Sequence, residues 1–333
     1  MSKVGFTTTI PLEILIAAKR TPVDLNNIFI THPDKKELLI NAESDGFPRN
    51  VCCWIKGIYS AALNTDISEI IAVTQGDCSN AQALMETLQF RGIKVVPFFY
   101  PYDRDQNLLS LSLKKLMDHY VVDEEQCLQA KGEMDRIRKK VHHIDELTWK
   151  EDIVSSEENH YYQVCTSDMN QDPLAFEREI DSFLSVLKNR KKFKEVLRLG
   201  YLGVPPIFND IYSFIESLNA RVVFNEMQRQ FSMPYLTTSL LDQYLSYTYP
   251  YDIFNRIEDI KKEVKRRKID GLIHYVQSFC FRQIEDTILK KTLKLPILTI
   301  EGDQPSPLDS RNKTKIEVFI EMLCRRKDNF SRQ

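Results

Sequence analysis

A strand–helix–strand pattern near the carboxyl terminus constrains the fold of this chain more than any other feature. Residues 271–276 form a short apolar run, which is typical of a parallel strand covered on both faces. A polar segment with helical spacing follows at residues 282–293, and a second apolar run occupies residues 295–300. This order predicts two parallel strands joined by a helix, since parallel strands need a long crossover connection.

Three side chains that could carry chemistry stand just after these two runs. Cys280 follows the first run, and Glu301 and Asp303 follow the second. Ligands of open α/β sheets bind outside the carboxyl ends of the strands, so we expect all three at one rim of the sheet. Capping of the next helix is an alternative role for the two carboxylates. His274 lies inside the first run, where a hydrogen-bonded core histidine is the structural alternative to a functional one.

The first half of the chain repeats this arrangement. Residues 69–74 indicate a buried strand, a helix runs from there toward Phe90, and residues 93–99 predict the next strand. Cys78 follows the first of these strands, as Cys280 does in the second half. Two such units predict an α/β protein with parallel sheets.

At 333 residues the chain is long enough for two domains of ordinary size. We expect a first α/β domain with an N-terminal helix at residues 1–150, a linker with connecting helices at 151–194, and a second α/β domain at 195–333. Residues 227–251 predict an aromatic insertion without clear period, whose tyrosines either line a site or pack the insertion itself.

The charge balance argues against several classes of partner. The chain has 45 basic and 47 acidic residues, and its basic runs have acidic neighbours, so nucleic acid is a poor candidate. No apolar run reaches the roughly 20 residues that span a bilayer. The start of the chain contains Glu13 and lacks a cleavage signal, so we expect a cytoplasmic protein. We also expect a solvated face for the charged cluster of His142-His143 and Asp145-Glu146.

Seven irregularly spaced cysteines fit free thiols or metal ligands better than a disulfide framework. Cys52, Cys78 and Cys280 each stand next to the end of a predicted element. Thiolates that leave one iron open hold 4Fe-4S clusters which also bind substrate. Spacing by itself leaves buried core cysteines as the alternative.

A series of short motifs runs through the chain in a fixed order. They are Pro11-Leu-Glu13 with Ala17-Ala18 and Pro22-Val23, Pro48 to Cys52 with Lys56, Gly76-Asp77-Cys78, Asp270 to Ile273 with Phe279-Cys280, Pro296 to Asp303, and Thr314-Lys315 with Glu317. Together they resemble the 2-hydroxyacyl-CoA dehydratase and benzoyl-CoA reductase family, in the form of a dehydratase D-component. Lys19 and Lys315 replace a glycine and an arginine that are usual there, and Lys56 selects Cys52 over Cys53 as the matching thiol.

The resemblance implies two flavodoxin-like domains that hold a 4Fe-4S cluster between them on Cys52, Cys78 and Cys280. It implies oxygen-sensitive lyase or reductase chemistry on an acyl-CoA or related substrate, through a ketyl-type radical. It also implies a separate ATP-dependent iron–sulfur activator, and either a homodimer or a related second subunit. Near such a cluster, Glu301, Asp303 and His274 are candidates for proton transfer.

Two alternatives remain open. A related branch of the family holds a double-cubane iron–sulfur cluster on six cysteines, which would need ligands from among Cys53, Cys127, Cys165 and Cys324. Adjacent side chains on a helix diverge by about 100°, which argues against joint use of Cys52 and Cys53. The other alternative is a non-catalytic, cluster-bearing subunit that transfers electrons to a partner or supports its structure.

Overall fold

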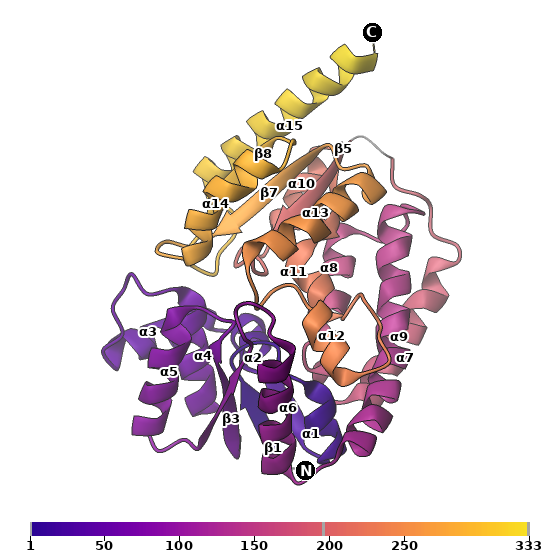
Figure 1. The fold of residues 1–333 in the computed structure, drawn as a ribbon. Helices are drawn as coiled ribbons and strands as arrows, with labels where there is room; N and C mark the ends of the chain where they lie inside the picture. The colour runs from indigo at the N-terminus through magenta and orange to yellow at the C-terminus, as the bar shows by residue number, and fades with distance from the viewer. Residues whose placement is uncertain (1, 195–196, 332–333) are drawn as a thin grey trace.

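Two four-stranded parallel sheets form the framework of the computed structural model, which describes residues 2–194 and 197–331 (Figure 1). The strands of the first sheet are β1 (Lys3–Phe6), β2 (Thr21–Asp24), β3 (Glu69–Gln75) and β4 (Val95–Phe99). Those of the second are β5 (Leu197–Leu202), β6 (Ala220–Asn225), β7 (Gly271–Val276) and β8 (Ile297–Glu301). The predicted α/β class with two flavodoxin-like sheets is confirmed.

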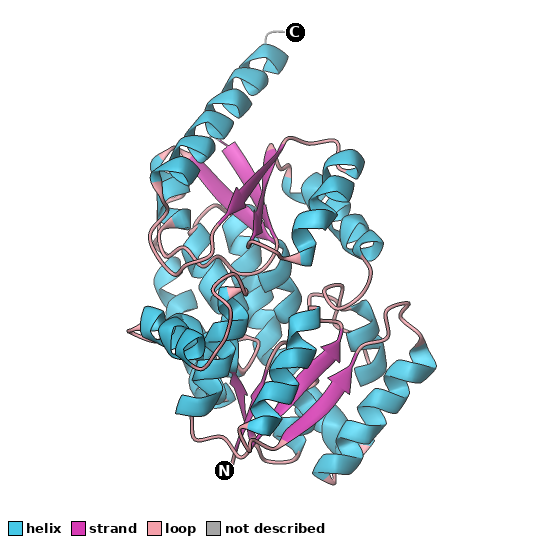
Figure 2. Cartoon of the chain, turned by 90° about the vertical axis from the view of Figure 1, so that its left-hand side faces the viewer, coloured by secondary structure: helices cyan, strands magenta, loops and turns pink. Residues whose placement is uncertain are grey.

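Both sheets have the same strand order. It is β2-β1-β3-β4 in the first sheet and β6-β5-β7-β8 in the second. In each sheet the strand that comes first in the chain, β1 or β5, lies between the second and the third. The strand order therefore reverses between β1 and β3, and between β5 and β7. A crevice opens at the carboxyl ends of each of these two pairs of strands. Figure 2 shows the arrowheads of both sheets directed toward the boundary between the two halves of the molecule. The two crevices therefore meet.

Helices cover both sheets and fill the space beside them. They are α1 (Leu12–Ala17), α2 (Leu25–Thr31), α3 (Lys35–Ser44), α4 (Cys53–Asn64), α5 (Ser79–Phe90), α6 (Gln106–Tyr120), α7 (Glu124–Trp149), α8 (Ser156–Cys165), α9 (Pro173–Leu187), α10 (Ile211–Ser217), α11 (Glu226–Phe231), α12 (Leu240–Ser246), α13 (Ile253–Arg267), α14 (Phe281–Thr292) and α15 (Ser310–Ser331), with a 3-10 turn at Met169–Gln171. The last turns of α15 extend away from the body (Figure 1). None of the helices in the described part of the chain is long and apolar enough to cross a membrane.

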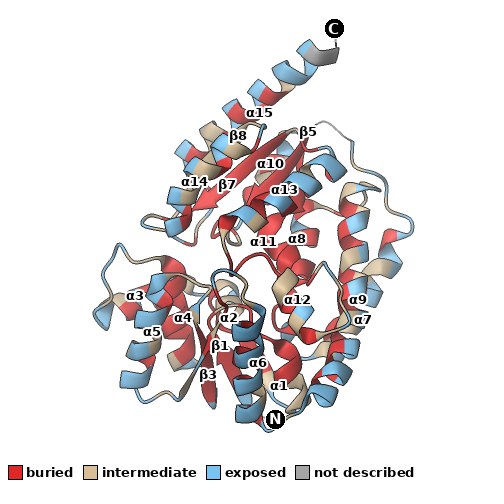
Figure 3. Cartoon of the chain, viewed as in Figure 1, coloured by how far each residue is buried: buried red, intermediate tan, exposed pale blue. Residues whose placement is uncertain are grey.

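Hydrophobic clusters join the two sheets. Phe29 and Trp54, from helices beside the first sheet, share a cluster with Tyr201 of β5. Tyr244 and Tyr251, from the predicted insertion, lie against Tyr100 at the end of β4, with ring centroids 6.4 and 5.9 Å apart. Figure 3 shows strands such as β3, β5 and β7 buried in the interior of the fold, whereas β4 and β8 are mostly half-buried. Because these clusters cross the expected boundaries at residues 150 and 194, the division into domains stays a prediction.

Several local expectations are corrected. The strands β1 and β2 were not predicted, since each has four residues and is too short for a periodic pattern. The polar segment after residue 151 contains α8, which begins with a capping box between Ser155 and Glu158. The insertion at 227–251 contains α11 and α12. Short or well-capped elements of this kind lack the apolar periodicity on which the predictions depend.

The expected solvated face is confirmed for His143 and Glu146, which are exposed, but it is wrong for Asp145. Asp145 is 6% exposed and accepts two hydrogen bonds from the guanidinium of Arg267, at 2.8 and 2.5 Å, and another from Asn159. Arg267 is itself buried, at the end of α13. The charge pattern of α7 does not reveal this ion pair, because Arg267 stands 122 residues after Asp145 in the chain.

Gly57 allows helix α4, which Cys52 caps, to pack closely against helix α2. A Cβ at this position would lie 2.3 Å from the buried ring of Phe29 on α2. We therefore expect Gly57→Ala to destabilise the protein by about 1–3 kcal/mol in urea denaturation, because the packed helices must move apart. Gly132→Ala is the matched control, since it meets nothing within 4 Å on α7. It should stabilise by about 0.5–1 kcal/mol. Equal effects of the two substitutions would contradict this packing.

Candidate functional site

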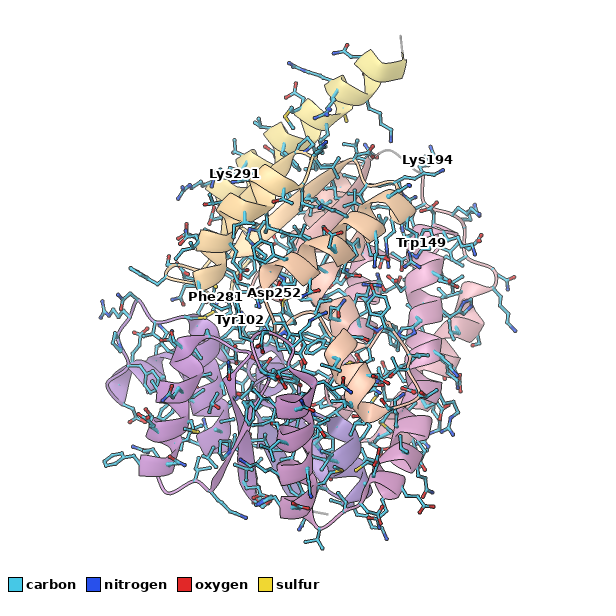
Figure 4. The ribbon with its side chains drawn as sticks, viewed as in Figure 1. Tyr102, Trp149, Lys194, Asp252, Phe281 and Lys291 are labelled. Carbon is cyan, nitrogen blue, oxygen red and sulfur yellow. The ribbon has the colours of Figure 1, made fainter. Side chains whose placement is uncertain are left out.

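A cavity lies where the carboxyl ends of the two sheets meet. It holds about 1020 Å³ of empty space, including the part that opens to solvent. The loops after the first and third strands of both sheets line it. These loops contribute Thr7, Thr8, Thr9, Asp77, Cys78, Val204, Pro205, Pro206, Gln277 and Cys280. Cys52 and Trp54, at the start of α4, complete the thiol-bearing wall. Phe281, next to Cys280, lies at the end of the second half that faces the first (Figure 4).

The three predicted cysteines are all at helix N-caps. Cys52 caps α4, Cys78 caps α5 and Cys280 caps α14, and none of the three side chains makes a capping hydrogen bond. The first turn of a helix leaves backbone N–H groups unpaired and carries the positive end of the helix dipole. Each sulfur therefore stands where negative charge is favoured, and all three line one cavity.

Burial raises the pKa of the Cys52 and Cys78 thiols, which favours their protonated form in the absence of a ligand. It raises the pKa of Cys52 well above the usual range, with Cys53 adding to the effect, although the N–H groups of Ile55 and Trp54 oppose it. Burial, then Asp77, raises the pKa of Cys78 to about 12. A metal that binds here must displace the thiol protons.

Gln277 separates the two adjacent cysteines. Its Oε1 accepts hydrogen bonds from Sγ of Cys52 at 2.8 Å and from the backbone N–H of Cys53 at 3.0 Å. Its Nε2 donates to Sγ of Cys53 at 2.8 Å and to the hydroxyl of Tyr275 at 2.9 Å. Cys52 thus lines the cavity, while Cys53 is 1% exposed within a hydrophobic cluster. Sequence reasoning missed Gln277, although its place just after β7 was a signal.

Glu301 and Asp303 hold the loop that precedes Cys280. The hydroxyl of Ser278 lies 2.6 Å from Oε1 of Glu301 and 2.7 Å from Oδ2 of Asp303, and the N–H of Ser278 donates to Oδ1 of Asp303 at 2.8 Å. Neither carboxylate is among the described residues that line the cavity. They do not cap the next helix either, because Asp309 accepts the N–H of Asn312 at its start. Both carboxylates instead contact Ser278, in the loop that precedes Cys280.

His274 lies away from the cavity lining. It is fully buried in β7, and its Nδ1 is 2.9 Å from Oδ1 of Asp286. Asp286 also accepts from the hydroxyl of Thr299 at 2.8 Å. These contacts fit a hydrogen-bonded core histidine, and a role in proton transfer stays a prediction.

His160 is a cavity residue that sequence reasoning missed. It stands on α8, and its Nδ1 lies 3.1 Å from the hydroxyl of Tyr212 and 3.3 Å from Nε2 of Gln228. Burial lowers its pKa to about 4. The residue belongs to the segment that was expected to be a linker, so no motif pointed to it.

The pH dependence of stability reports on this imidazole. Between about pH 4 and 6.5 the unfolded chain binds more protons at His160 than the folded protein does, so stability rises with pH through this window and falls on acidification. Relative to His160→Gln, we expect the wild type to lose about 2–2.5 kcal/mol more between pH 7 and 4.5. Urea denaturation at both pH values measures the difference. Parallel profiles would show that the imidazole is not held neutral.

The chemistry of the lining fits an iron–sulfur cluster better than a single ion. Among the described residues, no group of three or more His, Cys, Asp or Glu side chains lies close enough to hold one metal ion. In a cubane each thiolate binds a different iron, so its ligands lie further apart than those of one ion. The cavity offers three soft thiol donors of the kind that bind iron in such clusters, each at a helix N-cap.

A family model described as 2-hydroxyglutaryl-CoA dehydratase, D-component, matches residues 7–323. Comparison with curated proteins gives no match. The matched region contains all three cavity cysteines and seven of the eight strands in full. Members of this family bind iron–sulfur clusters and work with an activator component. The chain therefore belongs to the 2-hydroxyglutaryl-CoA dehydratase D-component family and is a component of the 2-hydroxyacyl-CoA dehydratase type.

Proposed function

We propose that Cys52, Cys78 and Cys280 hold a 4Fe-4S cluster in the cavity, and that the chain is the catalytic component of an ATP-activated dehydratase or reductase acting on a thioester. One observation carries this proposal. Three thiols from both halves of the molecule, each at a helix N-cap, line a single cavity. Cysteines that only pack in the core would not be expected both to occupy helix N-caps and to line the same cavity.

A cluster held there would supply one-electron chemistry at low potential, which protein side chains lack. The protein's own residues would stabilise the thiolates and hold them in position. The helix N-termini stabilise negative charge on the thiolates. Gln277 orients Cys52, and the contacts of Ser278 with Glu301 and Asp303 fix the loop that leads to Cys280. Apolar side chains in the lining keep water from the reacting groups.

The electron must come from another protein. The sequence has no phosphate loop of the form GxxxxGK[ST], so ATP use by this chain has no support. We propose that the activator is a separate iron–sulfur ATPase, and that the chain works with a second copy or a related subunit. All seven cysteines are free thiols, which suits a reducing, anaerobic cytoplasm.

The residues of the cavity favour catalysis over the two alternatives. A subunit that only transfers electrons needs no space for a substrate, yet the lining includes polar side chains such as Asn26, His160 and Arg282. A double-cubane cluster needs more thiols, and none of the other four cysteines is among the described residues that line the cavity.

Anaerobic reconstitution tests the proposal. The purified protein is supplied with iron and sulfide, desalted, and analysed for both elements per chain. About four of each supports a single cubane, and about eight irons would support the double-cubane alternative. Absence of bound iron and sulfide would refute the proposed function.

A further inference from the structure

The imidazole of His160, on helix α8, forms part of the cavity wall. The residue is half-buried, and its Nδ1 lies 3.1 Å from the hydroxyl of Tyr212 and 3.3 Å from Nε2 of Gln228. These two neighbours are buried, and neither is among the described residues that line the cavity. Nδ1 therefore points away from the cavity, and the edge of the ring that carries Nε2 is left to face it.

The buried groups behind the ring determine which nitrogen holds the proton. Gln228 presents an amide N–H to Nδ1 and to the hydroxyl of Tyr212, and an amide donor needs an unprotonated nitrogen as its acceptor. A proton on Nδ1 would require this amide to be turned over, which would leave its N–H groups buried without partners. Orphaned buried donors are rarer than orphaned carbonyl oxygens. The proton of the neutral ring is therefore on Nε2.

Asn225 supports the same assignment. The hydroxyl of Tyr212 lies 2.9 Å from its Oδ1, while its Nδ2 is buried and has no partner among the described residues. If the amide of Asn225 is turned over, Nδ2 donates to the hydroxyl oxygen of Tyr212, and the hydroxyl hydrogen is free to donate to Nδ1 of His160. In both orientations of Asn225, Nδ1 is an acceptor.

The ring offers the cavity one neutral N–H group. Burial lowers the pKa of His160 to about 4, so the imidazole is uncharged at neutral pH. None of the hydrogen bonds of the ring to described residues involves Nε2. Val164, one helical turn further along α8, and Val204 and Pro205 also line the cavity. A hydrogen bond from Nε2 would form in mainly apolar surroundings, where it is stronger than in water.

A neutral donor of this kind suits an oxygen on which negative charge develops. On uptake of one electron from the activator proposed above, a thioester carbonyl gains negative charge on its oxygen, and no bond of the thioester breaks in that step. A fixed N–H donor stabilises such charge without reorganisation of the site. A neutral imidazole does so without the cost of burying a cation, and it keeps its proton.

We infer that the Nε2–H of His160 donates a hydrogen bond to the carbonyl oxygen of the thioester, and that Tyr212 and Gln228 hold the ring for it. The inference rests on the proposed function for the thioester and adds to it a residue that polarises the carbonyl group. His160 is then a catalytic residue, whereas Tyr212 contacts the ring alone and is a positioning residue. The carbonyl is common to all thioesters, so this role is the same for any acyl group.

Nitrogen-15 NMR of the full chain, labelled in its histidine rings and without a cluster, tests the state of the imidazole. At pH 7 we expect the signals of a neutral ring protonated at Nε2, assigned to His160 by their absence from His160→Gln. Tyr212→Phe should shift the Nδ1 signal, since it removes the hydroxyl neighbour of that nitrogen. A proton on Nδ1, or a charged ring at pH 7, would overturn the inference.

Infrared spectroscopy of the reconstituted protein with 2-hydroxybutanoyl-CoA, carbon-13-labelled at the thioester carbonyl, tests the contact itself. We expect the carbonyl band of the bound probe to move to lower wavenumber and His160→Leu to abolish this shift. His160→Leu should also raise Kd roughly threefold to tenfold. His160→Gln keeps an N–H donor and should restore part of the shift. His143→Leu, at an exposed position of α7, is the control and should match the wild type.

An unshifted carbonyl band in the wild type, or an equal shift in His160→Leu, would overturn the inference. Failure of the probe to bind to protein that holds about four irons would overturn the assignment of a thioester to the cavity, and this inference with it. Iron and sulfide content, measured on the same sample, reports separately on the cluster of the proposed function. A fully loaded cluster with an unshifted band would therefore refute the role of His160 alone.

Discussion

Replacing Cys280 with alanine should reduce the cluster content of the reconstituted protein from about four irons per chain to almost none. Cys52→Ala and Cys78→Ala should do the same, because two remaining thiolates leave two irons of a cubane without protein ligands. The expected loss is read from iron analysis, from visible absorption, and from the electron paramagnetic resonance spectrum of the reduced protein. All three positions are partly accessible from the cavity, so the substitutions leave the hydrophobic clusters largely intact.

Two other cysteines provide matched controls. Cys53 adjoins Cys52 but packs in a hydrophobic cluster, and Cys324 is half-buried on α15. Cys53→Ala and Cys324→Ala should each retain the iron content of the wild type. Loss of iron in Cys53→Ala with retention in Cys52→Ala would show that the wrong member of the adjacent pair has been assigned to the cluster.

Arg256→Met, outside the cavity lining, should cause a large loss of stability. Arg256 is fully buried between Glu226, which is 1% exposed, and Glu285. Removal of one partner from a buried ion pair leaves an uncompensated charge and costs about 3–5 kcal/mol. Urea denaturation at neutral pH gives the free energy of unfolding.

Lys261→Met, on the same helix α13, is the control for this substitution. Lys261 pairs with Glu258 at 2.8 Å, and both side chains are largely exposed. Its removal should change stability by about 0–1 kcal/mol. A double variant, Arg256→Met with Glu226→Gln, should recover part of the loss by removing the stranded charge. A cost below about 1 kcal/mol for Arg256→Met would contradict a charged, buried pair.

The parts of the fold that sequence reasoning predicted are those with a long periodic signal. Strand β7, helix α14 and strand β8 lie close to their expected ranges because a buried parallel strand is a continuous apolar run and an amphipathic helix repeats every 3.6 residues. The four-residue strands β1 and β2 carry no such signal. Without them, the strand order could not be read from the apolar pattern, and a site between the two sheets was expected only from the family resemblance.

Some residues of the candidate site were predicted and others were not, because only some of them stand in a local sequence pattern. Cys52, Cys78 and Cys280 stand next to element ends and in short motifs, and the structure brings all three to one cavity. Arg282 carried no signal, since an arginine in the first turn of a polar helix usually faces solvent. Its burial depends on Tyr249, which stands 33 residues earlier in the chain. Tertiary contacts of this kind leave no local pattern.

Anomalous X-ray scattering at the iron edge, from anaerobically grown crystals of the reconstituted protein, tests the central claim most directly. The account predicts one compact group of iron peaks in the cavity between the two sheets, bonded to Sγ of Cys52, Cys78 and Cys280. Iron peaks at Cys127, Cys165 or Cys324, or a crystal without iron in the cavity, would contradict it.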